Sequence, residues 1–145
     1  MIDFKIKELG LLDYEEVWQS MVSAINNRSQ HAPDEVWLVQ HPPVYTLGYS
    51  GLEKDIINQE GIPVVRSDRG GQVTYHGPGQ IVGYPILDLD NFFTDIHKYL
   101  RLLEEAVILT LKEYELEGER SGGETGVWFD VGTSKARKIC ALGVK

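Results

Sequence analysis

The sequence predicts a domain of the α+β class, in which a mixed, mostly antiparallel β-sheet is combined with two main helices. Three observations indicate this class. Runs with strand character outnumber helical ones, several of those runs are joined by turns too short for a parallel crossover, and two segments have the apolar spacing of amphipathic helices. With 145 residues, the chain has the length of a single domain spanning residues 1–145.

The chain opens with a predicted strand and a predicted helix. Residues 4–8 alternate in the period-two pattern of a strand. Asp13 then precedes apolar residues at helical spacing up to Ile25, and Glu16 lies three residues after Asp13, as in a capping box. The polar residues 26–29 are expected to end this helix.

The middle of the chain is predicted to consist of strands and turns. Residues 41–48 begin with two prolines, which cannot donate backbone hydrogen bonds, so an extended loop or an edge strand is expected there. The Gly-Pro-Gly sequence at 77–79 is expected to turn the chain sharply. Apolar or alternating runs predict strands at residues 36–39, 62–66, 72–76 and 80–87.

A second helix and a β-hairpin are predicted to follow. Apolar residues spaced three or four apart from Leu100 to Tyr114 indicate a helix with one apolar face. Residues 127–131 and 138–144 have strand character, and the turn between them predicts a hairpin. The last of these strands is expected to continue to the end of the chain.

Composition and charge exclude several classes of protein. The net charge of −8, from 14 basic and 22 acidic residues, has the wrong sign for non-specific nucleic-acid binding. No apolar run is long enough to span a membrane and the N-terminus has no signal-peptide pattern, so a cytoplasmic protein is expected. Cys140 is the one cysteine, which excludes an intrachain disulfide. The basic stretch 131–145 is either solvated or a surface for an anionic ligand or an acidic partner.

The glycine-rich stretch 69–80 is the most informative segment. Its glycines at 70 and 71 have no Cβ, so the backbone there can approach a ligand closely. The stretch is neither a dinucleotide fingerprint nor a Walker loop, because both G-x-G-x-x-G and G-K-[ST] are missing. A ligand-facing loop is one interpretation and a plain glycine-rich hairpin is the other. Strand spacing sorts the residues that follow onto two faces, one with Gln72, Thr74 and His76 and the other with Val73 and Tyr75.

The longer string 69–86 closely resembles the signature of the bacterial octanoyltransferases of lipoate synthesis, which belong to the biotin and lipoate protein ligase superfamily. Residues 39–48 resemble the upstream segment of that family, and residues 125–128 and 137–143 resemble its downstream segments. The resemblance implies a fold of the biotin/lipoate protein ligase type. It covers most of the chain from residue 36 onward.

The resemblance also implies an acyl transfer. The family moves an octanoyl group from octanoyl-acyl carrier protein to a lysine of the lipoyl domains of 2-oxoacid dehydrogenases and of the glycine cleavage H protein, through a cysteine thioester. The family lysine near that cysteine corresponds to Lys138, whose ammonium would stabilise the thiolate and pass protons. A monomer without metal or other cofactor is expected. The residues that match the family's substrate-binding segments are Arg69, Gly70, Gly71, Gln72, Val73, Thr74, Tyr75, His76, Ala141, Leu142 and Gly143.

The sequence departs from the family at its nucleophile. In the family this cysteine lies well downstream of the catalytic lysine, after a His-Gly segment, and no such segment follows Lys138 here. Cys140 shares a strand face with Lys138, but it occupies a position where the family tolerates small apolar residues. A C-terminally truncated and inactive octanoyltransferase, with its nucleophile beyond residue 145, is therefore expected.

Two other functions are weighed against this one. An ATP-dependent lipoate or biotin ligase of the same superfamily would need an arginine-rich loop such as G-R-G-R for the acyl-adenylate, and Arg69-Gly70-Gly71 has no second arginine beside it. A non-catalytic module that binds the acyl carrier would need no nucleophile. The histidines are not expected to act: His76 is assigned to the shape of the pocket, His41 to a loop and His97 to a helix surface.

Overall fold

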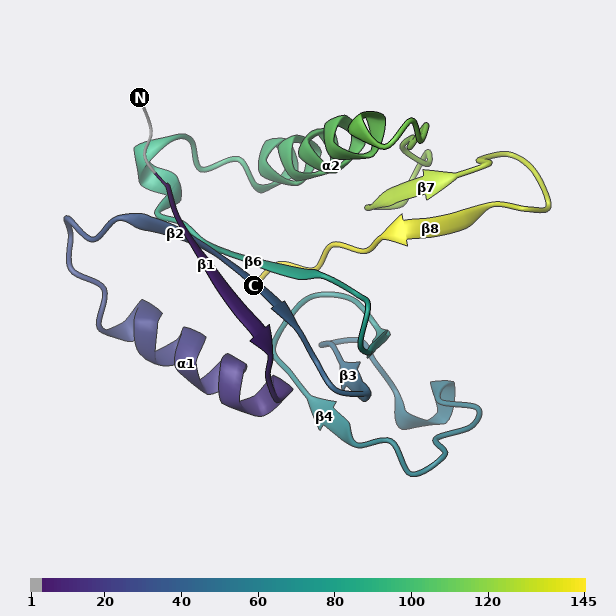
Figure 1. Cartoon of the computed structure of the whole chain (residues 1–145), viewed down its shortest axis with the longest axis horizontal. Helices are drawn as coiled ribbons and strands as arrows, with labels where there is room; N and C mark the ends of the chain where they lie inside the picture. The colour runs from purple at the N-terminus through teal and green to yellow at the C-terminus, as the bar shows by residue number, and fades with distance from the viewer. Residues whose placement is uncertain (1–3) are drawn as a thin grey trace. The chain divides into compact units, whose positions relative to one another are not determined.

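The computed structural model describes residues 4–145, and the chain divides into two compact units. The first unit runs to Phe92 and includes Lys145, and the second runs from Phe93 to Val144. Figure 1 shows the elements of each. The α+β class with mixed, mostly antiparallel pairing is confirmed. The expected single domain stays a prediction. Residues 1–3 lie outside the described residues.

Three strands and one helix form the core of the first unit. β1 (Phe4–Leu11) lies parallel to β2 (Asp34–Gln40), and β6 (Val82–Ile86) lies antiparallel to β2 on its other side. Parallel neighbours need a crossover connection, which α1 (Tyr14–Asn26) provides. The helix lies alongside this sheet in Figure 1.

The apolar face of α1 is buried against this sheet. Val17 of the helix is 1% exposed and packs with Trp37 and Val39 of β2 and with Ile86 of β6. Each fully buried side chain of this size stabilises the fold by roughly 1.5–3 kcal/mol. The helix and the sheet therefore hold each other in place through one continuous apolar cluster.

Asp13 determines where α1 begins. Its carboxylate accepts hydrogen bonds from the backbone N–H groups of Glu15 at 2.9 Å and Glu16 at 3.3 Å. N–H groups in the first turn have no acceptor inside the helix, so a carboxylate at this position satisfies them. The helix ends at Asn26, as the polar sequence predicts.

A second sheet of the first unit carries the glycine-rich loop. Its order is β4 (Val64–Arg66), β3 (Val44–Leu47) and β5 (Val73–His76), with β3 parallel to β4 and antiparallel to β5. The expectation of a loop or edge strand at residues 41–48 is therefore wrong for β3, which is central. Both prolines precede the strand, so each β3 residue keeps its N–H for one of the two ladders.

The second unit contains one long helix and a hairpin. α2 (Ile96–Glu113) begins at Asp95, whose carboxylate accepts a hydrogen bond from the Lys98 N–H at 3.0 Å. β7 (Val127–Phe129) and β8 (Arg137–Cys140) form the predicted antiparallel hairpin. Two short 3-10 helices, η1 (Glu53–Asp55) and η2 (Leu89–Asn91), lie in the connections of the first unit. No helix among the described residues has the length and apolar character needed to cross a membrane.

Two expectations for the second unit are wrong at their ends. Tyr114 follows the last residue of α2 and is 72% exposed, so it does not belong to the apolar face. β8 ends at Cys140 and does not continue to residue 144. Cys140 pairs with Val127, the first residue of β7, and the φ of +113° at Gly126 interrupts the extended backbone that further pairing needs.

The first prediction concerns the start of α1. Asp13→Ala removes the acceptor of two backbone N–H groups, so we expect the free energy of unfolding to fall by about 1 kcal/mol. Urea denaturation followed by circular dichroism measures this loss. Glu117→Ala, which removes an exposed carboxylate outside any helix, is the matched control. An equal effect of the two substitutions would show that Asp13 does not act as a cap.

Candidate functional site

Arg69 organises the glycine-rich loop of the first unit. Its guanidinium donates to the backbone oxygen and the Oγ1 of Thr46, both at 2.8 Å, to the Gln72 oxygen at 3.0 Å and to the Gly70 oxygen at 2.9 Å. All of these acceptors are uncharged, and burial lowers the pKa of Arg69. The arginine predicted to bind substrate therefore also ties its own loop to the central strand β3.

The loop lies in close contact with the end of β3. A Cβ placed on Gly48 would lie 2.3 Å from the Gly71 oxygen and 2.8 Å from a guanidinium nitrogen of Arg69, which leaves no space for a side chain. The N–H of Tyr49 donates to the Arg69 oxygen at 2.9 Å. Gly71 has a φ of +89°, a conformation that glycine adopts without strain. The loop backbone is therefore held by the hydrogen bond from Tyr49 and by the close packing of Gly71 against Gly48.

His76 and Arg69 both approach the Oγ1 of Thr46. Its Nε2 is 3.3 Å from the Thr46 Oγ1, and its Nδ1 donates to the Gln80 side-chain oxygen at 2.8 Å, because a carbonyl oxygen can only accept. Burial lowers the pKa of His76, and the nearby His41 and Arg69 act in the same direction, against the opposing effect of the Gln80 bond. These contacts describe a neutral, fixed imidazole.

Within β5 the predicted alternation of faces is confirmed for Thr74, Tyr75 and His76, whereas Gln72 precedes the strand. Thr74 pairs with Thr46 of β3, and His76 approaches the same threonine. Tyr75 points to the other side, where its ring meets Tyr45 edge-on at 5.5 Å between centroids. The remaining predicted residues of this segment differ in burial: Gly70, Val73 and Thr74 are half-buried, while Gly71, Gln72 and Tyr75 are exposed.

The structure has a buried aromatic cluster beside His76 that the sequence does not predict as part of the site. His41 is 0% exposed, and its Nδ1 donates to the Leu12 oxygen at 2.8 Å while the Tyr84 hydroxyl lies 2.9 Å from its Nε2. Tyr14 stacks on His76 with 5.9 Å between ring centroids and meets His41 edge-on at 5.3 Å. Burial raises the pKa of Tyr84. The sequence assigns His41 correctly to a loop, but its complete burial leaves no signal in the local pattern.

Lys138 lies on β8 of the second unit, opposite Trp128 of β7. Its ammonium lies over the Trp128 ring, 4.5 Å from the centroid, and 3.6 Å from a carboxylate oxygen of Glu124. About a third of the lysine side chain is exposed (34%), so Lys138 is partly accessible from solvent. The predicted residues Ala141, Leu142 and Gly143 follow β8 outside any strand, with Leu142 half-buried and the other two exposed.

The surroundings of Cys140 disfavour its thiolate form. Burial raises the pKa of its thiol, and the Glu104 carboxylate adds to this effect, which the nearby Lys138 opposes without reversing it. The thiol donates weakly to the Ala141 oxygen at 3.7 Å. Thiolate, not thiol, attacks an acyl group, so these surroundings oppose the one nucleophilic role that Cys140 would have.

The described residues 4–145 contain no group of three or more histidine, cysteine, aspartate or glutamate side chains that could hold a metal ion. The predicted site residues lie around Lys138 and in the glycine-rich loop. Each of these two groups lies within its own unit of the structure.

Comparison with known proteins identifies the family. A family model described as the lipoyl protein ligase A/B catalytic domain matches residues 13–145. The chain is 53% identical to an octanoyltransferase of Christiangramia forsetii and 55% identical to one of Flavobacterium johnsoniae, over 99% and 97% of its length. The chain belongs to the octanoyltransferase family. It spans 69% and 68% of the length of these two relatives.

Solved structures show the same fold. A bipartite lipoate protein ligase from Thermoplasma acidophilum superposes with a TM-score of 0.71 at 21% identity, covering 96% of this chain and 55% of the ligase chain. A lipoate-protein ligase A bound with ATP superposes with a TM-score of 0.67 at 16% identity, covering 86% of this chain and 52% of that one. The expected biotin/lipoate protein ligase-like fold of this octanoyltransferase family member is confirmed.

The second prediction concerns the Cys140 thiol of this octanoyltransferase family member. Because its pKa lies above that of a free thiol, the thiolate fraction at neutral pH is smaller, and alkylation by iodoacetamide should be slower than in the unfolded chain. The rate should rise with pH to a midpoint above that of the chain in urea. Intact-mass measurements over time provide both curves. A folded chain that reacts as fast as the unfolded one at neutral pH would contradict this assignment.

Proposed function

We propose that this protein takes part in the transfer of an octanoyl group from octanoyl-acyl carrier protein to a lysine of a lipoyl domain, with Lys138 beside the reacting sulfur. The observation that carries this proposal is the position of Lys138. It lies in the 137–143 segment of an octanoyltransferase family chain, on β8, with a partly exposed side chain. The lipoyl domains of 2-oxoacid dehydrogenases and of the glycine cleavage H protein are the proposed acceptors.

The proposed chemistry has two acyl exchanges. A cysteine thiolate attacks the octanoyl thioester of the carrier, the carbon–sulfur bond to the carrier breaks, and the carrier thiol leaves with a proton. The acceptor amine then attacks the new thioester, the carbon–sulfur bond to the enzyme breaks as the amide forms, and the enzyme thiol recovers a proton that the amine loses. A nearby ammonium favours the thiolate and can carry these protons, which is the role we assign to Lys138.

Cys140 does not supply the nucleophile of this scheme. Its raised pKa and its contact with the Ala141 oxygen support a structural thiol. We therefore propose that the 145-residue chain by itself does not complete the transfer, and that it requires a cysteine outside these residues. The octanoyl chain is proposed to lie along the glycine-rich loop and strand at residues 69–76 and along residues 141–143.

The hydrogen bonds of Arg69 support thioester exchange over activation by ATP. A ligase that forms an acyl-adenylate needs cationic side chains directed at phosphate, whereas the guanidinium of Arg69 donates to Thr46, Gly70 and Gln72 of its own loop and strand. Redirecting it would leave those oxygens without their donors. Release of pyrophosphate from ATP and octanoate by this chain would favour the ligase function instead.

The third prediction tests the proposed role of Lys138. A chimera that joins this chain to the remaining segment of the Christiangramia forsetii octanoyltransferase should octanoylate a lipoyl domain, and Lys138→Met should slow it by about 10²–10⁴-fold, the range for general acid–base catalysis. Intact mass of the lipoyl domain measures the transfer. Lys112→Met, which removes an exposed lysine near the end of α2, is the control.

Three outcomes would decide between the alternatives. Transfer by the 145-residue chain alone, at the rate of the chimera, would contradict its proposed inactivity. An unchanged rate in the Lys138→Met chimera would contradict the role of Lys138. Binding of octanoyl-acyl carrier protein by a chimera that never transfers the acyl group would favour the non-catalytic binding module.

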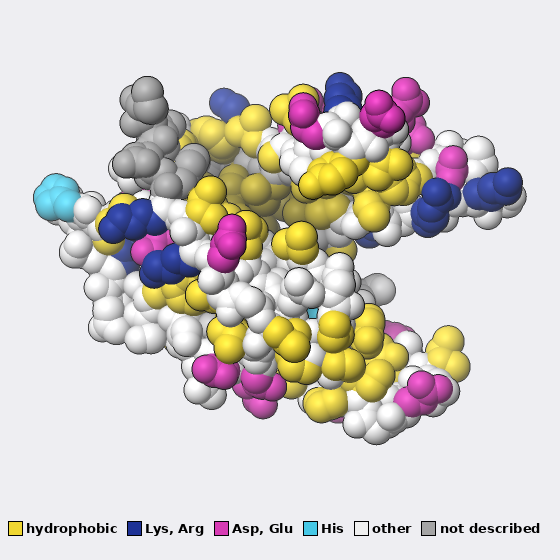
Figure 2. Space-filling model, viewed as in Figure 1, with side chains coloured by type: hydrophobic (Ala, Val, Ile, Leu, Met, Phe, Trp, Pro, Cys, Tyr) yellow, Lys and Arg dark blue, Asp and Glu magenta, His cyan; other side chains and the backbone are white. Residues whose placement is uncertain are grey.

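The β7–β8 hairpin is the proposed contact for an acidic carrier domain. Lys135 lies in its exposed turn, and Arg137 lies over the Phe129 ring at 5.3 Å and forms an ion pair with Asp130. Figure 2, in the same view as Figure 1, shows Lys and Arg side chains in dark blue at the end of the hairpin. Lys145 belongs to the first unit, where it forms an ion pair with Asp68. The basic stretch therefore contributes fewer available charges than its sequence suggests.

The fourth prediction is that charge reversal on this hairpin weakens carrier binding. Lys135→Glu should raise the Kd for octanoyl-acyl carrier protein by about fivefold at low salt and by less at high salt, because exposed charges are screened. Arg137→Glu should have the smaller effect, since Asp130 already offsets part of that charge. Fluorescence anisotropy of a labelled carrier provides the Kd values. If Lys54→Glu, on η1 of the first unit, has the same effect, the hairpin is not the docking surface.

A further inference from the structure

We propose that Glu104 is a positioning residue for Lys138, and that it acts through the backbone of Gly126. This inference deepens the proposed function, because it concerns the lysine to which that function assigns the proton transfers. It rests on a buried carboxylate, one close backbone approach and one ring contact, all within the second unit.

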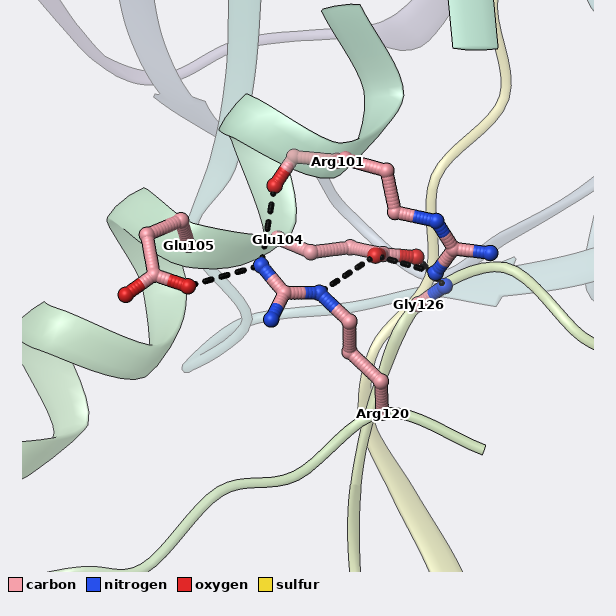
Figure 3. A network of polar contacts seen from close by, with 5 residues as sticks. All are labelled: Arg101, Glu104, Glu105, Arg120 and Gly126. Carbon is pink, nitrogen blue, oxygen red and sulfur yellow. Dashed lines mark hydrogen bonds and ion pairs between the residues drawn. The ribbon is translucent and has the colours of Figure 1, made fainter. Parts of the chain in front are cut away.

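The Glu104 carboxylate lies at the centre of the network in Figure 3. The residue is 0% exposed, whereas Lys98, Arg101, Lys112 and Glu113 of the same helix are exposed. Its Oε2 accepts from Arg101 at 2.6 Å and from Arg120 at 3.0 Å, and its Oε1 accepts from the Gly126 N–H at 2.9 Å. Both oxygens are satisfied, so the buried charge is stable only while all three donors stay in place.

Burial alone would raise the pKa of Glu104, but the Gly126 N–H and the guanidinium of Arg101 outweigh it, and the net shift is downward. The carboxylate therefore stays ionised at neutral pH. Arg120 is itself fixed by Glu105 at 2.7 Å and by the Arg101 oxygen at 3.0 Å. The two arginines neutralise one oxygen and leave the other for the backbone of the hairpin.

Gly126 is the point at which this network meets Lys138. A Cβ on Gly126 would lie 2.4 Å from the Cys140 oxygen and 3.4 Å from the Lys138 Cδ, so the backbone there is in direct contact with β8. Its φ of +113° excludes other residues as well. The aliphatic part of Lys138 therefore lies along Gly126, and the Glu104 bond holds that backbone in place.

The ring beneath the Lys138 ammonium is held from the same side. Trp128 follows Gly126 by two residues, and its backbone exchanges hydrogen bonds with Glu119 at 2.8 and 2.9 Å. Glu119 directly precedes Arg120, the second arginine on Glu104. Both the residue that Lys138 lies along and the ring that it lies over are thus attached to the same carboxylate network.

The test measures where the Lys138 amine lies. Brief acetylation with acetic anhydride, followed by peptide mass spectrometry, gives the modification rate of every lysine in the same sample. In Glu104→Leu the Gly126 N–H loses its acceptor, so Lys138 should modify about two- to fivefold faster relative to Lys98, the factor that corresponds to 0.5–1 kcal/mol of an exposed cation–π contact. Lys98 lies over the Phe93 ring at 4.6 Å and is a matched internal control.

Two further variants separate positioning from folding. Glu104→Gln keeps an oxygen for the Gly126 N–H, so the acetylation rate of Lys138 should stay close to that in the chain without a substitution. Glu104→Asp keeps the charge but withdraws it by one methylene, so it should also accelerate the acetylation of Lys138. It replaces Glu104→Leu as the test if thermal melting shows that the Leu variant does not fold. An unchanged ratio of Lys138 to Lys98 in a folded Leu or Asp variant would overturn the proposal.

The same ratio distinguishes the remaining outcomes. If Glu104→Gln accelerates Lys138 as much as Glu104→Leu, the charge and not the Gly126 bond acts on the lysine, and the proposed route is wrong. Acetylation does not depend on octanoyl transfer. Faster acetylation of Lys138 in the Glu104 variants, together with an unchanged transfer rate of the Lys138→Met chimera, would therefore overturn the proposed function alone. Unchanged acetylation of Lys138, together with a slowed Lys138→Met chimera, would overturn this inference alone.

Discussion

A charged group removed wholly or partly from water organises each of the two units. In the second unit the Glu104 carboxylate requires three donors, and these come from α2, from the chain before β7 and from the first residues of the hairpin segment. In the first unit the half-buried Arg69 guanidinium requires acceptors and finds them on β3 and its own loop. Because leaving such a group unpaired costs several kcal/mol, each one restricts the backbone around it to a single arrangement.

Glycines lie next to both of these charged groups: the Arg69 guanidinium donates to the Gly70 oxygen, and the Glu104 carboxylate accepts from the Gly126 N–H. Gly71 and Gly126 both have positive φ, and at Gly126 a Cβ would collide with the neighbouring strand. Glycine adopts this backbone conformation without strain and brings no Cβ to the close contact. Gly70, Gln72 and Gly126 are thus held by hydrogen bonds to charged side chains, although glycine-rich composition alone would suggest flexibility.

Much of the fold follows from local sequence. Asp13 and the apolar spacing after it are sufficient to predict α1, and the hairpin is predicted from its turn and flanking apolar runs. The sequence fails where burial depends on distant residues. Prolines before β3 suggest an edge although the strand is central, and Glu104 has the appearance of a solvent-facing helix residue although it is fully buried. Lys138 is predicted from its resemblance to a family motif, whereas its contact with Gly126 depends on the positive φ of that glycine, which the sequence alone does not indicate.

The contact between His41 and Tyr84 has a consequence for how the first unit tolerates change. His41 directly follows β2 and Tyr84 lies in β6, so their hydrogen bond joins the two ends of the chain excursion that contains β3, β4, β5 and the glycine-rich loop. Once the ends of an excursion are joined, lengthening it costs only about 0.6 kcal/mol of closure entropy per doubling. Insertions in the connection between β3 and β4 should therefore accumulate during evolution without disturbing the sheet that packs on α1.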